Sequence, residues 1–495
     1  MPITPRYVSF ASDPDAALGC WMQQNWLRLN PDKTPAAARR ADSRDGRGSR
    51  GESEGPAGAS QRRTIAPRGD ACKETGRGCG GVSEVTSPRG GLGGWCQCRQ
   101  MRQGMNRSCR LKAGARRQSM ELPSDILLYI FIFLSLEDRL SASLVCKQWA
   151  HIFTSAQLWK KVTVSFVNDT QEEDQKMQVL QKFGSLIKSL KLVCNQTVLT
   201  NRNNACRVMD HLANGSMNLA DLEIQFIGEN PYFYSGQDFL QSLKRLFSAA
   251  RSTDALHGFR QIDLRRLPLT LDADIVCSLA DRNRALHSLY LNNGSLVCLV
   301  SPECLLRVVK CCRQLSCLGV FHASLSSEVL DAFLEGDRKP LDMLEILCQR
   351  IDKYTYDIPG GMWKRLSERY VAMRVAVEFD HTVPVSRMNE ILKPEIPVST
   401  LRFKTFTYLV EQLEFTALNF AKTLTKLEIH TTKSEELNDA LMTIAKQCVC
   451  LQEILCYCVL SGETVQAFLT HCKCLRRYIL KQQLEPHPWL PVVVV

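Results

Sequence analysis

The chain has 495 residues and is 45% hydrophobic, which is enough to bury a large core and excludes a wholly disordered protein. Its net charge of +11 is typical of proteins that attract anionic partners. Of the 62 basic and 51 acidic residues, however, 21 and 10 lie in residues 1–119, so 41 of each remain for residues 120–495. The excess positive charge therefore belongs to the N-terminal quarter, and steering of anionic partners is expected only there.

The apolar runs are short. The longest, from Ile126 to Leu134, has half of the roughly 18 residues that a membrane-spanning helix needs, and MPITPRYVSF lacks the basic and apolar regions of a secretory signal. We therefore expect no membrane segment and a location in the cytosol, the nucleus or both. The 22 cysteines should stay reduced there and act as core residues, metal ligands or reactive thiols.

Residues 1–119 hold 17 of the 28 glycines and show no helical or strand periodicity, which predicts a disordered basic tail. Cys79, Cys96 and Cys98 are close enough in sequence for a loose zinc site, but no second pair with finger spacing joins them, so no metal is expected. The tail could contact phosphates nonspecifically, yet it lacks interleaved aromatic residues, and no specific nucleic acid is expected. Met120 directly follows, and the tail fits an alternative N-terminal extension.

The segment 120–165 indicates three short helices. Pro123 suits a first helical turn, and Ser124 and Asp125 add polar side chains at the same end. Apolar residues then recur with helical spacing. They are Ile126, Leu127, Ile130, Phe131, Phe133 and Leu134 in the first helix, Leu140, Leu144 and Val145 in the second, and Phe153, Leu158 and Trp159 in the third. Three helices in about 40 residues cannot bury such faces internally, so a neighbouring domain or a partner chain must cover them.

The same residues resemble the F-box pattern along nearly its full length, above all in Leu122-Pro123, in Val145-Cys146-Lys147-x-Trp149 and in Leu158-Trp159. This resemblance implies a three-helix module that docks on the Skp-type adaptor of a Skp/cullin/F-box ubiquitin ligase. The residues that it implies at the adaptor are Leu122, Pro123, Ile126, Ile130, Leu134, Val145, Cys146 and Trp149. The alternative is an ordinary helical hairpin packed on the next domain. Cys146 is assigned a packing role, because nothing near it in sequence would activate a thiol.

A second periodicity follows, with apolar residues at positions 1, 4 and 6 of repeated units. The units start at Ile187, Leu219, Phe259, Leu286, Leu315, Leu341, Ala372, Val398, Leu424, Leu451 and Leu475. Successive starts lie 24 to 40 residues apart, and most lie in or near the range of roughly 20 to 29 residues that is typical of leucine-rich repeats. We therefore expect an α/β solenoid of irregular repeats, each with one strand and one helix.

Cysteines accompany this pattern. Cys312, Cys448 and Cys472 each stand three residues before a predicted strand, where a small apolar thiol packs against the neighbouring repeat. The C-x-C pairs raise the alternative of zinc, but the repeat position explains Cys448 and Cys472, and Cys456 falls on an inward position. We expect no metal, no cofactor and no catalytic residue, because no histidine-paired cysteine or separate catalytic lobe is recognisable.

Strand alternation predicts which side chains a partner could contact. Positions 4 and 6 point into the core, so positions 3, 5 and 7 point to the concave face. Phe321, Met343 and Leu347 should form an exposed apolar group there, and an aromatic loop at 228–236 could cap the stack or touch a substrate. The residues predicted to bind a substrate are Tyr290, Phe321, Met343, Leu347, Arg402 and Lys404.

Both parts together resemble the F-box/leucine-rich-repeat proteins, as seen in LRRLPLTLDADIV, LHSLYLNN, SGETVQAFLTHC and EPHPW. The predicted organisation is a disordered extension at 1–119, an F-box at 120–165, leucine-rich repeats at 166–484 and a tail at 485–495. The family implies a non-catalytic substrate receptor, in which the F-box holds the adaptor and cullin scaffold and the repeats hold a protein substrate. A ligase-independent scaffold and a nucleic-acid binder driven by the tail are the alternatives.

Overall fold

The computed structural model describes residues 122–167, 173–215, 219–229, 236–249, 258–351 and 357–482. The chain divides into two compact units, Met1–Glu121 and Leu122–Val495, and every described residue belongs to the second. Several predictions therefore lie outside the described residues: the tail at 1–119 with its cysteines, most of the aromatic loop at 228–236, and the C-terminal tail at 485–495.

The described part begins with the three expected helices, α2 (Ser124–Ile132), α3 (Leu136–Ser143) and α4 (Lys147–Phe153). Pro123 directly precedes α2 and is one residue short of the first turn in which it was expected. The third helix is shorter than predicted. Leu158 and Trp159 lie beyond α4 in a turn and are fully buried, because the indole stacks on Phe183 of the next helix.

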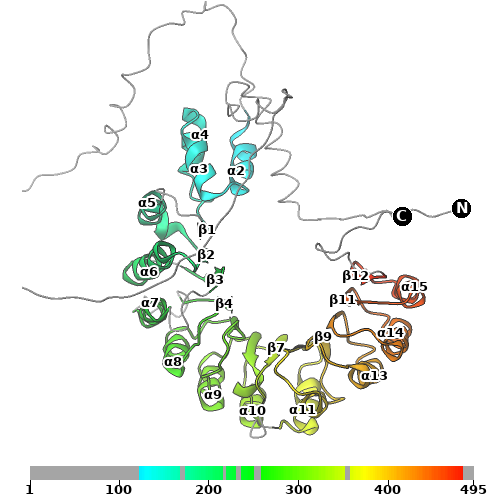
Figure 1. Cartoon of the computed structure of the whole chain (residues 1–495). Coiled ribbons are helices and arrows are strands. Elements are labelled where there is room, and N and C mark those ends of the chain that lie inside the picture. The colour runs from blue at the N-terminus through cyan, green and yellow to red at the C-terminus, as the bar shows by residue number, and fades with distance from the viewer. Residues whose placement is uncertain are drawn as a thin grey trace, which may run out of the picture. The chain divides into compact units, whose positions relative to one another are not determined.

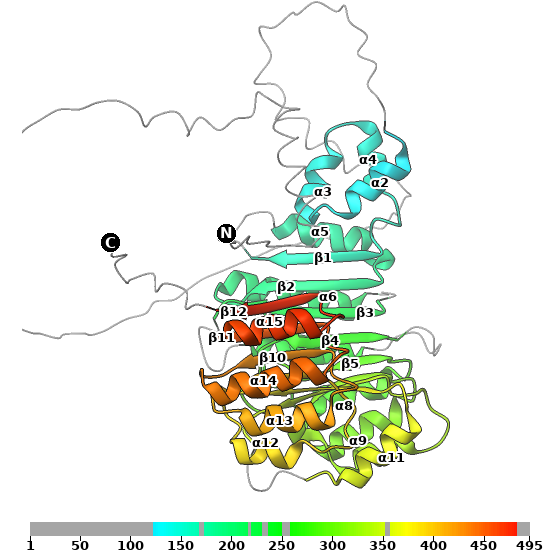
Figure 2. The same cartoon turned by 90° about the vertical axis from the view of Figure 1, so that its right-hand side faces the viewer.

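A single parallel sheet follows, whose twelve described strands pair in chain order from β1 to β12. The strands are β1 (Lys161–Phe166), β2 (Ser189–Asn195), β3 (Asp221–Ile227), β4 (Gln261–Arg266), β5 (Ser288–Tyr290), β6 (Cys317–Phe321), β7 (Met343–Cys348), β8 (Arg374–Phe379), β9 (Val398–Lys404), β10 (Lys426–His430), β11 (Glu453–Val459) and β12 (Arg477–Lys481). Figure 2 shows them stacked side by side. Parallel neighbours need a crossover, and a helix supplies most of these connections.

The helices form a second layer outside the strands (Figure 1). They are α5 (Glu173–Phe183), α6 (Leu199–Asn214), α7 (Gln237–Ser248), α8 (Ala273–Arg282), α9 (Pro302–Cys311), α10 (Ser327–Leu334), α11 (Gly360–Arg369), α12 (Val385–Ile391), α13 (Val410–Asn419), α14 (Glu435–Gln447) and α15 (Gly462–His471). Because helices are wider than strands, the repeats curve with the strands on the inner side. None of the described helices is long and apolar enough to cross a membrane.

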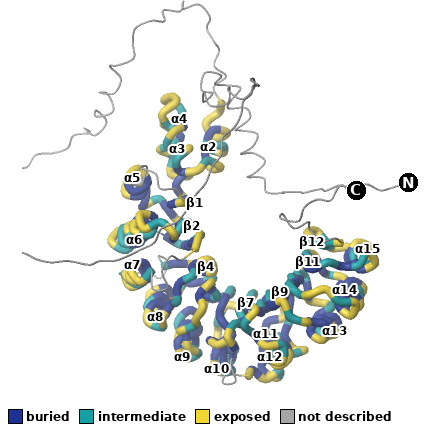
Figure 3. The backbone as a smooth tube through the Cα atoms, in the orientation of Figure 1, coloured by how far each residue is buried: buried dark blue, intermediate teal, exposed yellow. Residues whose placement is uncertain are grey.

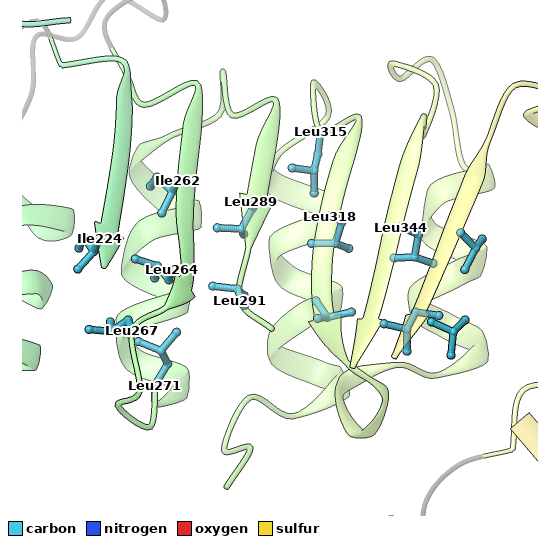
Figure 4. Close-up of a cluster of buried hydrophobic side chains, with 14 of the residues drawn as sticks. Ile224, Ile262, Leu264, Leu267, Leu271, Leu289, Leu291, Leu315, Leu318 and Leu344 are labelled. Atoms are coloured by element: carbon cyan, nitrogen blue, oxygen red, sulfur yellow. The ribbon is translucent and has the colours of Figure 1, made fainter. Parts of the chain in front are cut away.

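The core lies between the two layers (Figure 3). Position 4 of one repeat pairs with position 4 of the next, as in Ile262 with Leu289, Leu289 with Leu318, and Leu318 with Leu344. Figure 4 shows these side chains pointing from the strands toward the helices, and all are fully buried. The predicted α/β solenoid and its inward leucines are therefore confirmed.

Two units depart from the predicted pattern. Ala372 was predicted as the apolar residue at position 1 of its unit, but it is exposed, and the neighbouring Met373 is buried. The register between β8 and β9 shifts after Val375, so that Leu401, at position 4 of its unit, pairs with Val377, at position 6 of the preceding unit. The prediction for Ala372 was wrong because this residue lies in the turn between α11 and β8, where the N–H of Met373 donates to the carbonyl oxygen of Tyr370.

Local capping explains where several helices begin. The side chains of Asp272, Ser301, Ser326, Ser434 and Ser461 each accept a hydrogen bond from the backbone N–H three residues later. Such capping satisfies one of the unpaired donors at a helix start and contributes about 1 kcal/mol. A capping residue therefore fixes the direction in which the chain leaves the strand edge and enters the outer layer.

Candidate functional site

The helix α2 has a buried side and an exposed side. Leu127 and Phe131 are fully buried, whereas Ile126 and Ile132 are exposed and Tyr129 is 61% exposed. The exposed residues are spaced by three, which places them on one side of the helix. The sequence pattern predicted Ile126 and Phe131 on the same face of the helix, but in the structure Ile126 lies on the exposed side and Phe131 on the buried side.

A buried arginine fixes the turn between α2 and α3. Arg139 donates hydrogen bonds to the carbonyl oxygens of Phe131, Ile132 and Leu158, at 2.9, 2.9 and 3.3 Å. The last carbonyl groups of a helix lack partners within it, so the guanidinium satisfies them and ties the end of α2 to the chain after α4. The exposed side of α2 is thereby held in a fixed orientation.

More apolar side chains are exposed between α3 and α4. The second helix ends at Ser143, so Leu144 and Val145 lie in a turn and not on a helix face, and Leu144 is 82% exposed. Cys146 next to them is also exposed. We call the exposed apolar set of this helical module the module face. It comprises Leu122, Ile126, Tyr129, Ile132, Phe133, Leu144 and Val145.

The eight residues predicted at the adaptor fall into two groups. Five of them are exposed: Leu122, Pro123, Ile126, Val145 and Cys146. The other three, Ile130, Leu134 and Trp149, are half-buried, and the indole of Trp149 packs edge-on against Phe131 with ring centres 5.6 Å apart. Adaptor binding stays a prediction for all eight. Tyr129 and Ile132 were missed, although their spacing from Ile126 was visible in the sequence.

On the inner side of the repeats, Arg265 is the centre of a polar network. Its guanidinium contacts Asp263 at 2.6 Å and Glu345 at 3.1 Å, and its carbon lies 4.1 Å from the ring centre of Tyr290. Asn292 also donates to Glu345 at 3.2 Å. The hydrogen bond to Asp263 raises the pKa of Arg265, and burial raises the pKa of Tyr290 to about 12.

Gly319 makes room for this network. It lies on β6 beside Tyr290 on β5 and Glu345 on β7. A Cβ atom at this position would lie 2.2 Å from Oδ1 of Asn292 and 2.8 Å from Cδ1 of Tyr290. Any side chain at this position would displace the side chains of Asn292 and Tyr290 from the network, which spans β4 to β7.

A second charged group lies further along the inner side. Glu378 contacts Lys404 at 2.7 Å and Arg402 at 3.3 Å, and Arg402 also approaches Glu428 at 3.7 Å. His430 contacts Glu428 at 3.2 Å and stacks on Tyr457 with ring centres 4.3 Å apart. These side chains come from β8 to β11. Neighbouring repeats thus neutralise one another's charges, and the predicted Arg402 and Lys404 are held in place.

Both groups border a hollow of about 850 Å³, which we call the concave hollow. The charged residues that line it are Glu223, Asp263, Arg265, Arg266, Glu345, Glu378, Asp380, Arg402 and Lys404. Of the six residues predicted to bind a substrate, Leu347, Arg402 and Lys404 line this hollow. The guanidinium of Arg265 lies over the ring of Tyr290, and Met343 is half-buried.

Phe321 was predicted to be exposed on the inner side, and this expectation is wrong, since it is only 4% exposed. The strand β6 ends at Phe321, and a short 3-10 turn at His322–Ser324 follows at once. Strand alternation does not hold at the last residue before a turn, and Val320 and Phe321 are both buried. The expected apolar group therefore does not exist as an exposed patch.

An ordered loop after β5 supplies exposed apolar side chains instead. Leu296, which is 58% exposed, Val297 and Leu299 lie in it, and Leu296 lines the concave hollow. Asn293 anchors the loop by donating to the carbonyl oxygen of Leu269 at 2.7 Å, and Gln349 donates to that of Ser295 at 2.9 Å. No periodic signal marks these residues, because the loop follows a strand of only three residues.

The repeat cysteines pack in the core as predicted. Cys312, Cys448 and Cys472 are buried, and Sγ of Cys472 lies 3.5 Å from the carbonyl oxygen of Ala445. Burial raises the pKa of Cys312 and Cys448 to about 12 and that of Cys472 to about 11. These thiols are therefore protonated and inert near neutral pH. Within the described ranges, no group of three or more His, Cys, Asp or Glu side chains could hold a metal ion.

Known proteins resemble the chain in both parts. A family model described as F-box-like matches residues 120–165. F-box/LRR-repeat protein 8 of Homo sapiens is 34% identical over 374 residues, which cover 75% of this chain and 98% of that protein. The Mus musculus protein of the same name is 33% identical over the same shares. F-box/LRR-repeat protein 21 of Ovis aries is 23% identical over 62% of this chain and 68% of its own length. The resemblance of the sequence motifs to the F-box/leucine-rich-repeat proteins is confirmed.

Proposed function

Because this chain belongs to the F-box/leucine-rich-repeat family, we propose that it is the substrate-recognition subunit of a Skp/cullin/F-box ubiquitin ligase. In this proposal the helical module binds a Skp-type adaptor and, through it, a cullin scaffold. The repeats capture the protein to be ubiquitinated. F-box/LRR proteins are generally ligase adaptors and not catalysts, so the chain positions a substrate while other subunits transfer ubiquitin. We also propose that it acts in the cytosol or the nucleus.

The observation that carries the proposal is the module face. It exposes seven large apolar side chains from one short helix and the turns near it, where a solvated surface would carry polar groups. Burying such area contributes about 25 cal/mol per Å², so a partner that covers several of these side chains gains much of its affinity there. A ligase-independent scaffold would need its own chain to cover this face, and none of the described residues does so.

The concave hollow is the proposed substrate site. Its charged side chains form ion pairs with one another before any partner binds. Arg265, for example, pairs with Asp263 and Glu345. A partner must replace or extend these contacts, which penalises proteins with the wrong charge pattern and favours selectivity. The exposed Leu296 adds an apolar contact at its edge.

Affinity capture of the adaptor tests the proposal. In the full chain, Ile126→Asp together with Val145→Asp puts two carboxylates on the module face, and burying them against an apolar partner is costly. We expect adaptor capture to fall at least about 100-fold, with far-ultraviolet circular dichroism unchanged.

The matched control is Leu199→Asp with Val371→Asp. Leu199 and Val371 are also exposed, but they lie on the repeats and not on the helical module. This variant should capture as much adaptor as the native chain. Full adaptor capture by the folded Ile126/Val145 variant would contradict the ligase proposal.

A further inference from the structure

Exposed aromatic side chains gather at the last repeats. Among the described residues, two exposed aromatic side chains belong to the module face, and the others are Phe406, Tyr408, Tyr457 and Tyr478. Phe406 is 65% exposed and Tyr408 is 54% exposed. Both lie in the loop between β9 and α13, and Tyr457 lies on β11. Single exposed rings are normal on a protein surface, but rings that gather on neighbouring elements indicate an interaction surface.

His430, the last residue of β10, joins two of these rings. Its imidazole stacks on Tyr457 with ring centres 4.3 Å apart and meets the ring of Phe406 edge-on at 5.6 Å. We call Phe406, Tyr408, His430 and Tyr457 the aromatic rim. The rim continues the concave hollow, because His430 pairs in register with Lys404, which lines the hollow. A protein segment bound in the hollow can therefore reach the rim.

The backbone at Phe406 is held in a costly conformation. Its φ of 56° lies in the left-handed region, where a bulky side chain is rare. Two hydrogen bonds connect this loop to β10 and the residue after it: the N–H of Phe406 donates to the carbonyl oxygen of His430 at 2.9 Å, and the hydroxyl of Thr431 donates to the carbonyl oxygen of Thr407. Such strain persists where the surrounding structure enforces it, and it is common at ligand clamps. A fixed backbone therefore presents the ring of Phe406 to solvent.

Carboxylates surround the same loop. Partial burial of the phenol, and then the charges of three neighbouring carboxylates, raise the pKa of Tyr408. The three are Glu436, Glu414 and Glu411, and all are exposed. Lys433 is also exposed, so three negative charges and one positive charge leave a net charge of −2. Acidic residues at a helix start also interact favourably with the helix dipole, so this charge indicates a ligand only together with the rings.

The concave hollow contains rings and carboxylates together with their cation. The guanidinium of Arg265 lies 4.1 Å from the ring centre of Tyr290 and pairs with Asp263 and Glu345. A cation is attracted to the face of an aromatic ring, and a guanidinium also stacks on it. The aromatic rim offers the same two kinds of group at the surface, where a partner can supply the cation.

Rings and carboxylates together favour one chemistry in the partner. Exposed carboxylates attract basic side chains and repel phosphates and other carboxylates. We infer that the aromatic rim binds a lysine- or arginine-rich segment of the protein substrate, whose basic side chains lie against Phe406, Tyr408 and Tyr457. This inference rests on the proposed function, since it names the class of substrate that the repeats capture.

Fluorescence anisotropy of the full chain with a labelled peptide tests the inference. The probe is a glycine/serine peptide of twelve residues that includes four arginines, and the comparison peptide has citrulline, a neutral analogue, at the same positions. We expect the arginine peptide to bind at least about tenfold more tightly. Its affinity should fall as salt is added, because the carboxylates are exposed. Equal affinities for the two peptides would overturn the inference.

Two variants separate the rings from the charges. Phe406→Gly with Tyr408→Ser removes two rings, and glycine adopts the positive φ without strain, so the loop should stay folded. Affinity for the arginine peptide should fall about tenfold. Glu414→Gln with Glu436→Gln keeps the rings and should lower the affinity about threefold. Native affinity in the folded Phe406/Tyr408 variant would contradict the proposed site.

The matched control is Tyr129→Ser, which removes a similarly exposed ring from the module face. It should bind the arginine peptide as the native chain does, with reduced adaptor capture. The Phe406/Tyr408 variant should show the opposite, with native adaptor capture, so the ligase proposal and this inference can fail separately. Tighter binding of a single-stranded oligonucleotide than of the arginine peptide would also overturn the inference, because stacked bases would then be the ligand of the rim.

Discussion

The module face and the concave hollow differ in the chemistry that they expose. Leu144, Tyr129 and their neighbours on the module face are apolar, and contact with a partner removes them from water. In the hollow, Arg265 and Lys404 already have carboxylate partners before a substrate binds. An apolar face favours tight binding with little geometric demand, whereas a neutralised polar surface favours the partner whose groups fit it. The module face is therefore suited to binding a shared scaffold, and the concave hollow is suited to binding an individual substrate.

The largest expected effect comes from removing the support that holds the hollow. Leu318 is buried between β5 and β7, so Leu318→Asp buries a carboxylate without a partner. It should lower the free energy of unfolding by about 4 kcal/mol or more. Thermal unfolding measures this loss, and Leu296→Asp, at an exposed position, should change it little. Native-like unfolding of the Leu318 variant would rule out the repeat register.

Arg265→Gln should have a smaller effect on stability and a selective one on binding. It leaves Asp263 and Glu345 without their cation, at a cost of about 1 kcal/mol, because the side chain of Arg265 is 40% exposed and solvent screens the pair. Protein profiles captured by the variant and the native chain should differ, while adaptor capture stays equal. Identical profiles would exclude the hollow as the substrate site.

The smallest expected effect is a change in thiol labelling that leaves stability untouched. At pH 8 an alkylating reagent should modify the exposed Cys146 and Cys474 but not Cys312, whose pKa of about 12 leaves roughly one thiolate in ten thousand. Adding the adaptor should protect Cys146 and leave Cys474 reactive, as peptide mass spectrometry would report. Equal modification of Cys146 with and without adaptor would place the adaptor elsewhere.

Sequence periodicity was sufficient for the repeats because their core is periodic. Leu289 and Leu318 could be placed from spacing alone, since position 4 meets the same buried environment in these neighbouring repeats. Periodicity failed where the chain leaves the strand. Phe321 precedes a turn, and Leu296 lies in a loop held by hydrogen bonds from Asn293 and Gln349, which no spacing records.

In the helical module, the sequence identified the apolar residues but not which of them are buried. Leu158 and Trp159 were assigned to a helix, but tertiary packing on Phe183 places them in a turn. The exposed face of α2 also required the direction of each side chain around the helix, which depends on what Leu127 and Phe131 contact. Residue type identified the apolar set, while three-dimensional contacts divided it into core and surface.

The stacked strands also give the inner side a fixed measure of length. Neighbouring parallel strands lie about 4.8 Å apart, so the twelve strands extend over roughly 53 Å along the curve. The hollow reaches from Glu223 on β3 to Lys404 on β9, which is about 29 Å, or the length of some nine extended residues. Adding or deleting one repeat would therefore move every later contact by one strand spacing and change the size of the partner that fits the inner side.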